Sequence, residues 1–320
     1  MGQTESSARL LDWSRTFLRD RGIRHHSQVD NEDLAESLRK FLDIPAFVRL
    51  PDLLSKCRSL GIVLEDLPPL SDDLFALNGW YDEGAPVILL RPDQAITRYQ
   101  HSLGHELREV IENAFKRTGL NYRGLDTHDN QRMNPHSDRF ASRLLMPTSE
   151  SIALLAQLGY DLLGFSQETS RSLPSVVVRA ESLFSATSPA GPLAGAWLYE
   201  APWPKVKNRK SQLRDLVMTQ HAFMNGFRVG ETEGPFPSLR SEAYDQNTVY
   251  DSLLSRRPSC DVFLSKNRFV GRKDYYLIAE PAFVRGWPWR VLLTAIRIDE
   301  TRPMAQPWID RVLGKESAQA

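Results

Sequence analysis

The sequence predicts an α+β fold, in which a small β-sheet packs against a central helix and a second, strand-rich part follows. Apolar residues between Ile96 and Phe115 recur at steps of mostly three or four, as in an amphipathic helix. Two strand-like runs precede this helix, Leu74 to Tyr81 and Pro86 to Leu90, with turn-forming residues between them. Strands that lead directly into such a helix favour an α+β core over a doubly wound α/β core.

The chain before these strands is predicted to be mainly helical. Residues 6–21 and 34–42 have the pattern of short helices and make up an N-terminal helical segment, residues 1–47. A further helix is expected over Leu50 to Leu60, and the short apolar strand Ile62 to Leu64 follows it.

After the central helix, the polar and glycine-containing residues 116–135 predict a surface loop. The next helix is expected to begin at His136 and to end at Pro147. Two more helices are predicted over residues 149–159 and 175–184. They could form a helix-turn-helix, but Arg171 and Arg179 are the only basic residues there, so a structural helix pair is the better interpretation.

Small residues at positions 185–192 predict a linker and a domain boundary. Beyond it we expect a C-terminal domain, residues 193–310, of α/β or mostly β structure, suited to sensing or to contact with a partner. Its predicted strands span residues 193–199, 260–264, 274–279 and 290–298.

Composition limits the classes of protein to which the chain can belong. It has 320 residues, with 40 Lys and Arg against 40 Asp and Glu, so no net charge attracts nucleic acid or an anionic membrane. Cys57 and Cys260 are the only cysteines, which argues against a disulfide framework and against a thiolate zinc site. No apolar run reaches 18 residues and the N-terminus lacks a secretory pattern. We therefore expect a cytoplasmic protein without a membrane contact; its oligomeric state stays open.

The central helix carries a cluster of polar residues with metal-ligand spacing. His101, His105 and Glu109 follow each other at intervals of four residues, so their side chains stack one turn apart, with Glu106 beside them. The metallopeptidase signature H-E-x-x-H uses two histidines as zinc ligands and the glutamate as general base. Here Glu109 takes the place of the second histidine. By itself this pattern is more often a solvated helix face with ion pairs between successive turns.

Two segments resemble the ImmA/IrrE family of metallopeptidases. The phrase DRFASRLLMP, Asp138 to Pro147, resembles the family segment A-N-x-F-A-x-x-L-L-M-P, and Leu103 to Leu107 resembles the start of the family helix L-A-H-E-L-G-H. The resemblance covers roughly residues 48–184. It implies a zincin-like metallopeptidase domain there, with the two last helices as a trailing pair.

The resemblance also implies a set of zinc ligands. Family members bind zinc through both motif histidines and a glutamate four residues before the phenylalanine of the second segment. In this chain that position is His136, while Glu109 replaces the second motif histidine. The inventory of two imidazoles and one carboxylate is unchanged, and such a set with an open fourth position is catalytic in other enzymes. The implied ligands are His105, Glu109 and His136, with one Zn²⁺ per chain, although Mn²⁺ or Fe²⁺ would also accept them.

Three further residues receive roles beside these ligands. Glu106 would be the catalytic residue, taking a proton from a metal-activated water. Asp138 would orient a ligand or cap its helix. His101 would replace Glu109 as a ligand, orient it, or act near the scissile carbonyl.

The resemblance implies a regulatory, zinc-dependent endopeptidase that cleaves a protein substrate such as a transcriptional repressor. The C-terminal domain would then be the sensor or docking surface, and one branch of the family carries a GAF-like domain there. The alternative is a catalytically degenerate zincin that binds a metal or a partner and regulates without cutting. A DNA-binding regulator is disfavoured by the balanced charge and the sparse arginines, so direct nucleic-acid binding is not expected.

Overall fold

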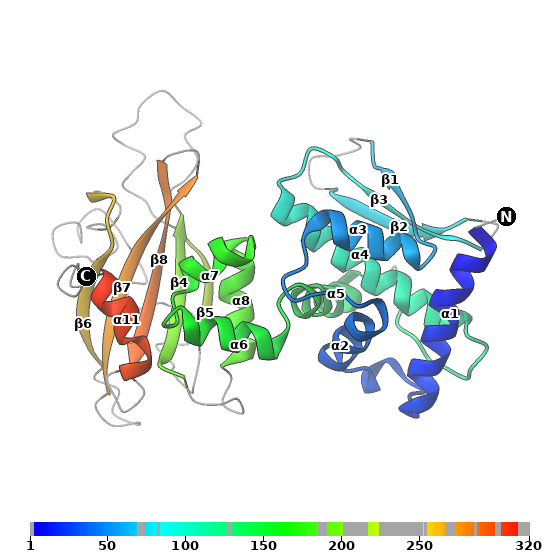
Figure 1. The fold of residues 1–320 in the computed structure, drawn as a ribbon, viewed down its shortest axis with the longest axis horizontal. Helices are drawn as coiled ribbons and strands as arrows, with labels where there is room; N and C mark the ends of the chain where they lie inside the picture. Colours follow the sequence, from blue (N-terminus) through cyan, green and yellow to red (C-terminus); the bar gives the residue numbers. More distant parts are fainter. Residues whose placement is uncertain are drawn as a thin grey trace. The chain divides into compact units, whose positions relative to one another are not determined.

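The computed structural model describes residues 3–68, 74–81, 84–126, 130–184, 191–200, 217–223, 252, 255–265, 273–284, 287–297 and 302–312. The chain divides into two compact units, residues 1–150 and 151–320, which are described separately. Both combine helices with a sheet, so the predicted α+β class is confirmed (Figure 1). The predicted domain boundaries stay predictions, and residues 185–190 of the predicted linker lie outside the described part.

The first unit contains a three-stranded sheet beside a long helix (Figure 1). Strands β1 (Val63–Asp66) and β2 (Ala76–Trp80) flank β3 (Pro86–Leu90), with β1 parallel and β2 antiparallel to it. Helix α4 (Ile96–Arg117) packs against β2 and β3, as the apolar periodicity of its sequence predicts. The edge strand β2 therefore lies next to the helix that carries the H-E-x-x-E motif.

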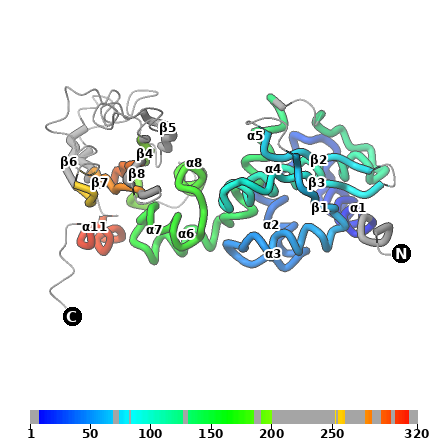
Figure 2. The backbone as a smooth tube through the Cα atoms, turned by 90° about the horizontal axis from the view of Figure 1, so that it is seen from above, coloured from blue at the N-terminus to red at the C-terminus, as the bar shows by residue number. Residues whose placement is uncertain are grey.

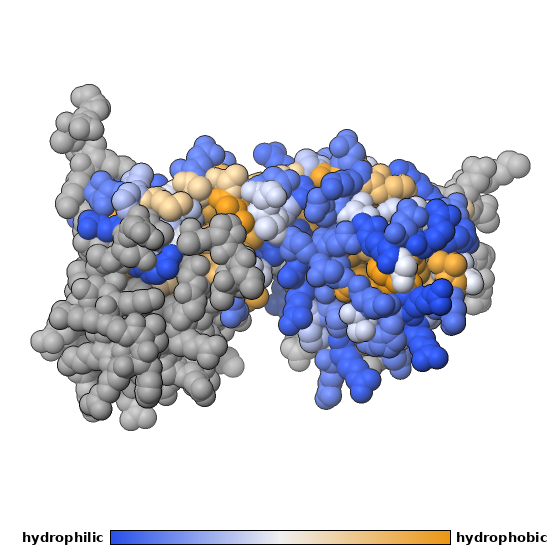
Figure 3. Space-filling view, turned by 90° about the horizontal axis from the view of Figure 1, so that it is seen from below, coloured by the Kyte–Doolittle hydropathy of each residue, from blue (hydrophilic) through white to orange (hydrophobic). Residues whose placement is uncertain are grey.

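Helices α1 (Gln3–Asp20), α3 (Leu50–Ser59) and α5 (Asn130–Leu145) pack against α4, and α2 (Asn31–Leu42) packs against α5. Leu103, Leu107 and Ile111 of α4 are fully buried in the core that these helices share. The face that Figure 3 shows of this unit is mostly hydrophilic, with a limited hydrophobic area. Burial of the apolar stripe thus fixes which side of α4 faces inwards and which carries the polar motif.

The start of α5 corrects the sequence prediction. Residues 116–135 were expected to form a loop before a helix starting at His136, but α4 extends to Arg117 and α5 already begins at Asn130. Pro135 lies inside α5 and does not end it. Pro135 is the sixth residue of α5, beyond the first turn, so it removes one backbone donor from the helix, which continues to Leu145.

Helices α4 and α5 approach closely at Gly104. A Cβ atom at this position would lie 3.0 Å from the Cβ and 3.2 Å from the Cα of Ala141. Close approach requires small residues at the contact, and a backbone atom cannot move aside as a side-chain tip can. This contact sets the distance between the two helices that carry the predicted site.

We expect Gly104→Val to lower the free energy of unfolding by about 1–3 kcal/mol, because the larger side chain forces the two helices apart. Urea unfolding followed by circular dichroism measures the loss. Gly104→Ala is the graded control, since its higher helix propensity, worth about 1 kcal/mol, offsets part of the crowding. A Val variant as stable as wild type would show that the helices are not in tight contact.

The second unit contains a five-stranded sheet in the order β5-β4-β8-β7-β6, antiparallel throughout. The strands are β4 (Leu193–Glu200), β5 (Val217–Phe223), β6 (Ser259–Ser265), β7 (Lys273–Val284) and β8 (Trp287–Arg297). All four strands predicted after residue 192 are present, and β5 is an addition.

The helices of this part are α6 (Thr148–Gln157), which spans the division between the units, α7 (Leu162–Thr169), α8 (Leu173–Leu183) and α11 (Gln306–Val312). In Figure 2, α7 and α11 lie on the same side of the sheet. Helix α7 was missed in the sequence. Across the described residues, no helix combines the length and the apolar character needed to cross a membrane.

Candidate functional site

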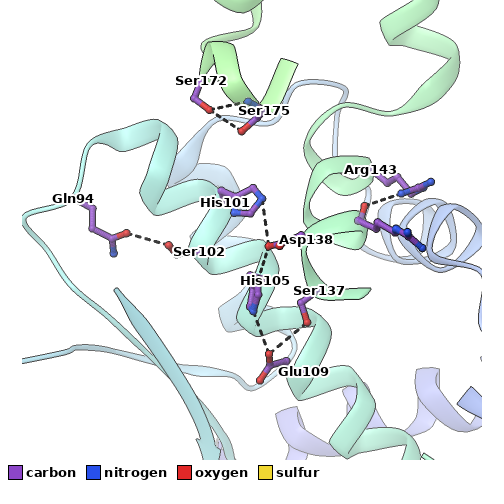
Figure 4. Close-up of polar contacts among 11 residues, drawn as sticks. Gln94, His101, Ser102, His105, Glu109, Ser137, Asp138, Arg143, Ser172 and Ser175 are labelled. Atoms are coloured by element: carbon purple, nitrogen blue, oxygen red, sulfur yellow. Dashed lines mark hydrogen bonds and ion pairs between the residues drawn. The ribbon is translucent and has the colours of Figure 1, made fainter. Parts of the chain in front are cut away.

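His105 is the centre of a polar cluster between α4 and α5 (Figure 4). Its Nδ1 lies 2.8 Å from Oδ1 of Asp138, and its Nε2 lies 3.2 Å from Oε1 of Glu109. With a carboxylate at each ring nitrogen, both nitrogens act as donors, which is the arrangement of a protonated imidazolium. The one-turn spacing predicted to bring His105 and Glu109 together does so.

Helix α5 faces this cluster with Ser137 and Asp138. The same Oδ1 of Asp138 lies 3.9 Å from Nε2 of His101, so that carboxylate stands between the two histidines (Figure 4). Ser137 is buried and its hydroxyl lies 3.5 Å from Oε1 of Glu109. Of the roles considered for Asp138, orientation of His105 matches these contacts.

Asn78 of strand β2 connects the cluster to the sheet. Its Nδ2 donates to Oε2 of Glu106 and to Oε2 of Glu109, each at 2.7 Å. Sequence reasoning missed this residue. The signal was present, because Asn78 is the polar residue in the otherwise apolar run LFALNGWY.

Burial controls the electrostatics of the two motif residues. Burial and the neighbouring Glu109 raise the pKa of Glu106 to about 7, although the hydrogen bond from Asn78 opposes the shift. For His105, burial alone lowers the pKa, but the carboxylates of Asp138 and Glu109 outweigh it and raise the pKa to about 10. Burial lowers the pKa of His101.

His136 points to a different neighbour. Its Nδ1 lies 3.4 Å from Nδ2 of Asn31 at the start of α2. Burial and the guanidinium of Arg108 lower the pKa of His136. The structure therefore brings His105, Glu106 and Glu109 together, and it directs His136 towards α2.

The predicted zinc site can be tested against these positions. His105 and Glu109 provide two converging donors, and Asp138 on Nδ1 of His105 is a common way to orient a metal-binding histidine. Yet within the described part of the chain, no three His, Cys, Asp or Glu side chains are grouped so that they could hold a metal ion. In this arrangement the residues do not fit a three-ligand zinc site. The ligand roles of His105, Glu109 and His136 stay predictions, as does the catalytic role of Glu106.

Comparison with known proteins identifies the part of the chain that contains this cluster. Residues 57–181 match the family model of Peptidase M78, described as the IrrE N-terminal-like domain. This segment is an IrrE N-terminal-like domain. The resemblance seen in the HEL and FASRLLMP segments is thereby confirmed, and the domain is metallopeptidase-like.

The chain was also compared with solved structures and with curated proteins. A solved structure titled Mycobacterium tuberculosis transcriptional regulator is similar, with a TM-score of 0.49 and 14% sequence identity over 88% of this chain and 80% of that one. No curated protein matches the chain.

A buried ion pair lies next to the cluster within the IrrE-like domain. Arg108 and Glu112, one turn apart on α4, are both fully buried, with Nη1 2.8 Å from Oε2. Glu112 also accepts hydrogen bonds from the hydroxyl of Tyr122, at 3.0 and 3.2 Å, and from the backbone N–H of Leu125 at 2.8 Å. Each charge therefore has an opposite charge as its partner, while Nη2 of Arg108 has no hydrogen-bond partner among the described residues.

Proposed function

We propose that the chain is a metallopeptidase-like regulatory protein that acts by binding a protein partner and does not cut it. The observation that carries this proposal is the position of His136, which does not join His105 and Glu109. A zinc ligand needs a free ring nitrogen directed at the metal, together with two more donors. Here the third predicted donor, His136, is directed at Asn31.

The helix pair does not favour a nucleic acid as the partner. Arg171 and Arg179, the two basic residues considered for DNA binding, are buried. Phosphate contacts require exposed cations, and each one contributes to the salt dependence of binding. We propose that the five-stranded part of the chain provides the sensor or docking surface.

A second candidate is the zinc-dependent endopeptidase that cleaves a repressor. One contact favours it: Nε2 of His105 and Oε1 of Glu109 are 3.2 Å apart. Two ligand atoms about 2.0–2.2 Å from a zinc ion lie roughly 3.3–3.5 Å apart in tetrahedral geometry. In this candidate His105, Glu109 and His136 would hold the metal, which would supply an activated water, and Glu106 would be the general base.

Metal content distinguishes the two candidates. We expect elemental analysis of the full chain, purified without chelator, to find far less than one zinc per chain in wild type and in His136→Ala alike. One zinc per wild-type chain that is lost in His136→Ala would overturn the proposal and establish the endopeptidase site. Zinc that stays in His136→Ala but is lost in His101→Ala would also overturn it, and would assign different ligands.

A cleavage test gives an independent measurement. We expect cells that express wild type and cells that express Glu106→Gln to yield the same set of newly formed protein N-termini, because neither protein cuts. N-termini that appear with wild type and vanish with Glu106→Gln would show peptidase activity and contradict the proposal.

A further inference from the structure

Arg108 stands where the family helix L-A-H-E-L-G-H has its glycine. The replacement introduces the largest basic side chain at a position directly beside Glu109, and the side chain is fully buried. Burying a guanidinium is costly unless it is paired, so its partners reveal what it holds in place.

The contacts of Arg108 lead from α4 through α2 to α5. Its Nε donates to Oδ1 of Asn31 at 3.3 Å, and its Nη1 donates to Glu112. The amide of the same Asn31 lies 3.4 Å from Nδ1 of His136. Since the Oδ1 of Asn31 is engaged by Arg108, its Nδ2 is oriented towards the histidine.

Glu112 prevents the guanidinium from moving. Because Tyr122 and the backbone of Leu125 also bind this carboxylate, it is held by the segment that follows α4. Arg108 is thus fixed by a buried acceptor that cannot follow it elsewhere, and the orientation of Asn31 follows.

We infer that Arg108 is a positioning residue that holds His136, through Asn31, away from His105 and Glu109, and so prevents the cluster from collecting a third metal ligand. This inference deepens the proposed function and rests on it. It explains physically why a domain of this family has two converging donors and no complete ligand set.

The test is zinc affinity of the full chain, measured by competition with a chromophoric chelator. We expect Arg108→Met/Glu112→Gln to bind zinc at least roughly tenfold more tightly than wild type, because His136 is released. Gln at position 112 keeps an acceptor for Tyr122 and Leu125. The matched control is Arg143→Met/Glu32→Gln, which removes another ion pair between α5 and α2, of 2.8 Å, and should bind zinc like wild type.

Adding His136→Ala to the Arg108→Met/Glu112→Gln variant should abolish the gain in zinc affinity. In the variant that retains His136, diethyl pyrocarbonate should modify this histidine faster than it does in wild type. A double variant that unfolds cooperatively, like wild type, but binds zinc no more tightly overturns the inference alone. A gain that persists without His136 also overturns it. Tight zinc binding by wild type overturns the proposed function as well.

Discussion

Replacement of Arg108 alone by methionine is expected to lower the free energy of unfolding by about 3–5 kcal/mol. Glu112 would remain fully buried after its counter-charge is gone, with the hydroxyl of Tyr122 and the N–H of Leu125 as its remaining donors. Leaving one member of a buried pair uncompensated costs far more than removing both charges, because the desolvation penalty of the survivor is no longer offset. Urea unfolding followed by circular dichroism, with linear extrapolation, measures the effect.

The double variant Arg108→Met/Glu112→Gln should recover most of that loss, since it removes both charges and keeps the acceptor oxygen. Arg143→Met removes a partly exposed ion pair with Glu32 and should cost less than about 1 kcal/mol. If Arg108→Met came within about 1 kcal/mol of wild type, Glu112 would have to be stabilised by its neutral donors alone, and it would not be the acceptor that fixes Arg108.

The periodicity of apolar residues in the sequence correctly predicted the long central helix and most of the strands. The apolar periodicity from Ile96 to Phe115 gave α4, which the structure extends only to Arg117, and alternating or continuous apolar runs gave β2, β3 and the strands after residue 192. Helix α7 was missed because it is short, contains Gly164 and begins at an N-cap, Asp161, whose carboxylate is also engaged by Arg311. Arg311, which contacts the other oxygen of that carboxylate, is 150 positions away in the sequence.

In the candidate site, the sequence likewise predicted the contacts within one helix and did not predict the contacts between helices. His105, Glu106 and Glu109 lie together because they share one helix, which the spacing alone decides. Which side chains of α5 face the cluster depends on how that helix is rotated about its own axis. A shift of one residue along a helix turns the side chain by about 100°. The close contact of Gly104 with Ala141 and the link from Arg108 through Asn31 set this rotation, so Ser137 and Asp138 face the cluster. These tertiary contacts leave no periodic signal in the sequence.

Glu280→Gln is expected to stabilise the protein at pH 8 by about 2–4 kcal/mol and to leave its stability at pH 5 nearly unchanged. Glu280 of β7 is buried, and burial together with the negative charge of Asp161 raises its pKa from 4.5 to about 8, although Arg311 opposes the shift. The folded state thus binds a proton that the unfolded state has released between these two pH values. Stability is therefore greatest at low pH within this range and falls as the pH rises from about 5 to about 8. Glutamine stays neutral throughout and removes this dependence.

The decisive quantity is the difference in unfolding free energy between wild type and Glu280→Gln, measured by urea titration at pH 5, 6, 7 and 8. Taking the difference cancels the titration of every group that the substitution leaves untouched. Asp310→Asn on α11, which removes a carboxylate bonded to Gln306 at 2.7 Å, is the matched control measured over the same pH range. A difference between wild type and Glu280→Gln that stays constant across the range would mean that Glu280 is ionised in the folded protein, with Arg311 compensating both Asp161 and Glu280. A difference that grows with pH would mean that the folded sheet holds this carboxyl group protonated near neutral pH.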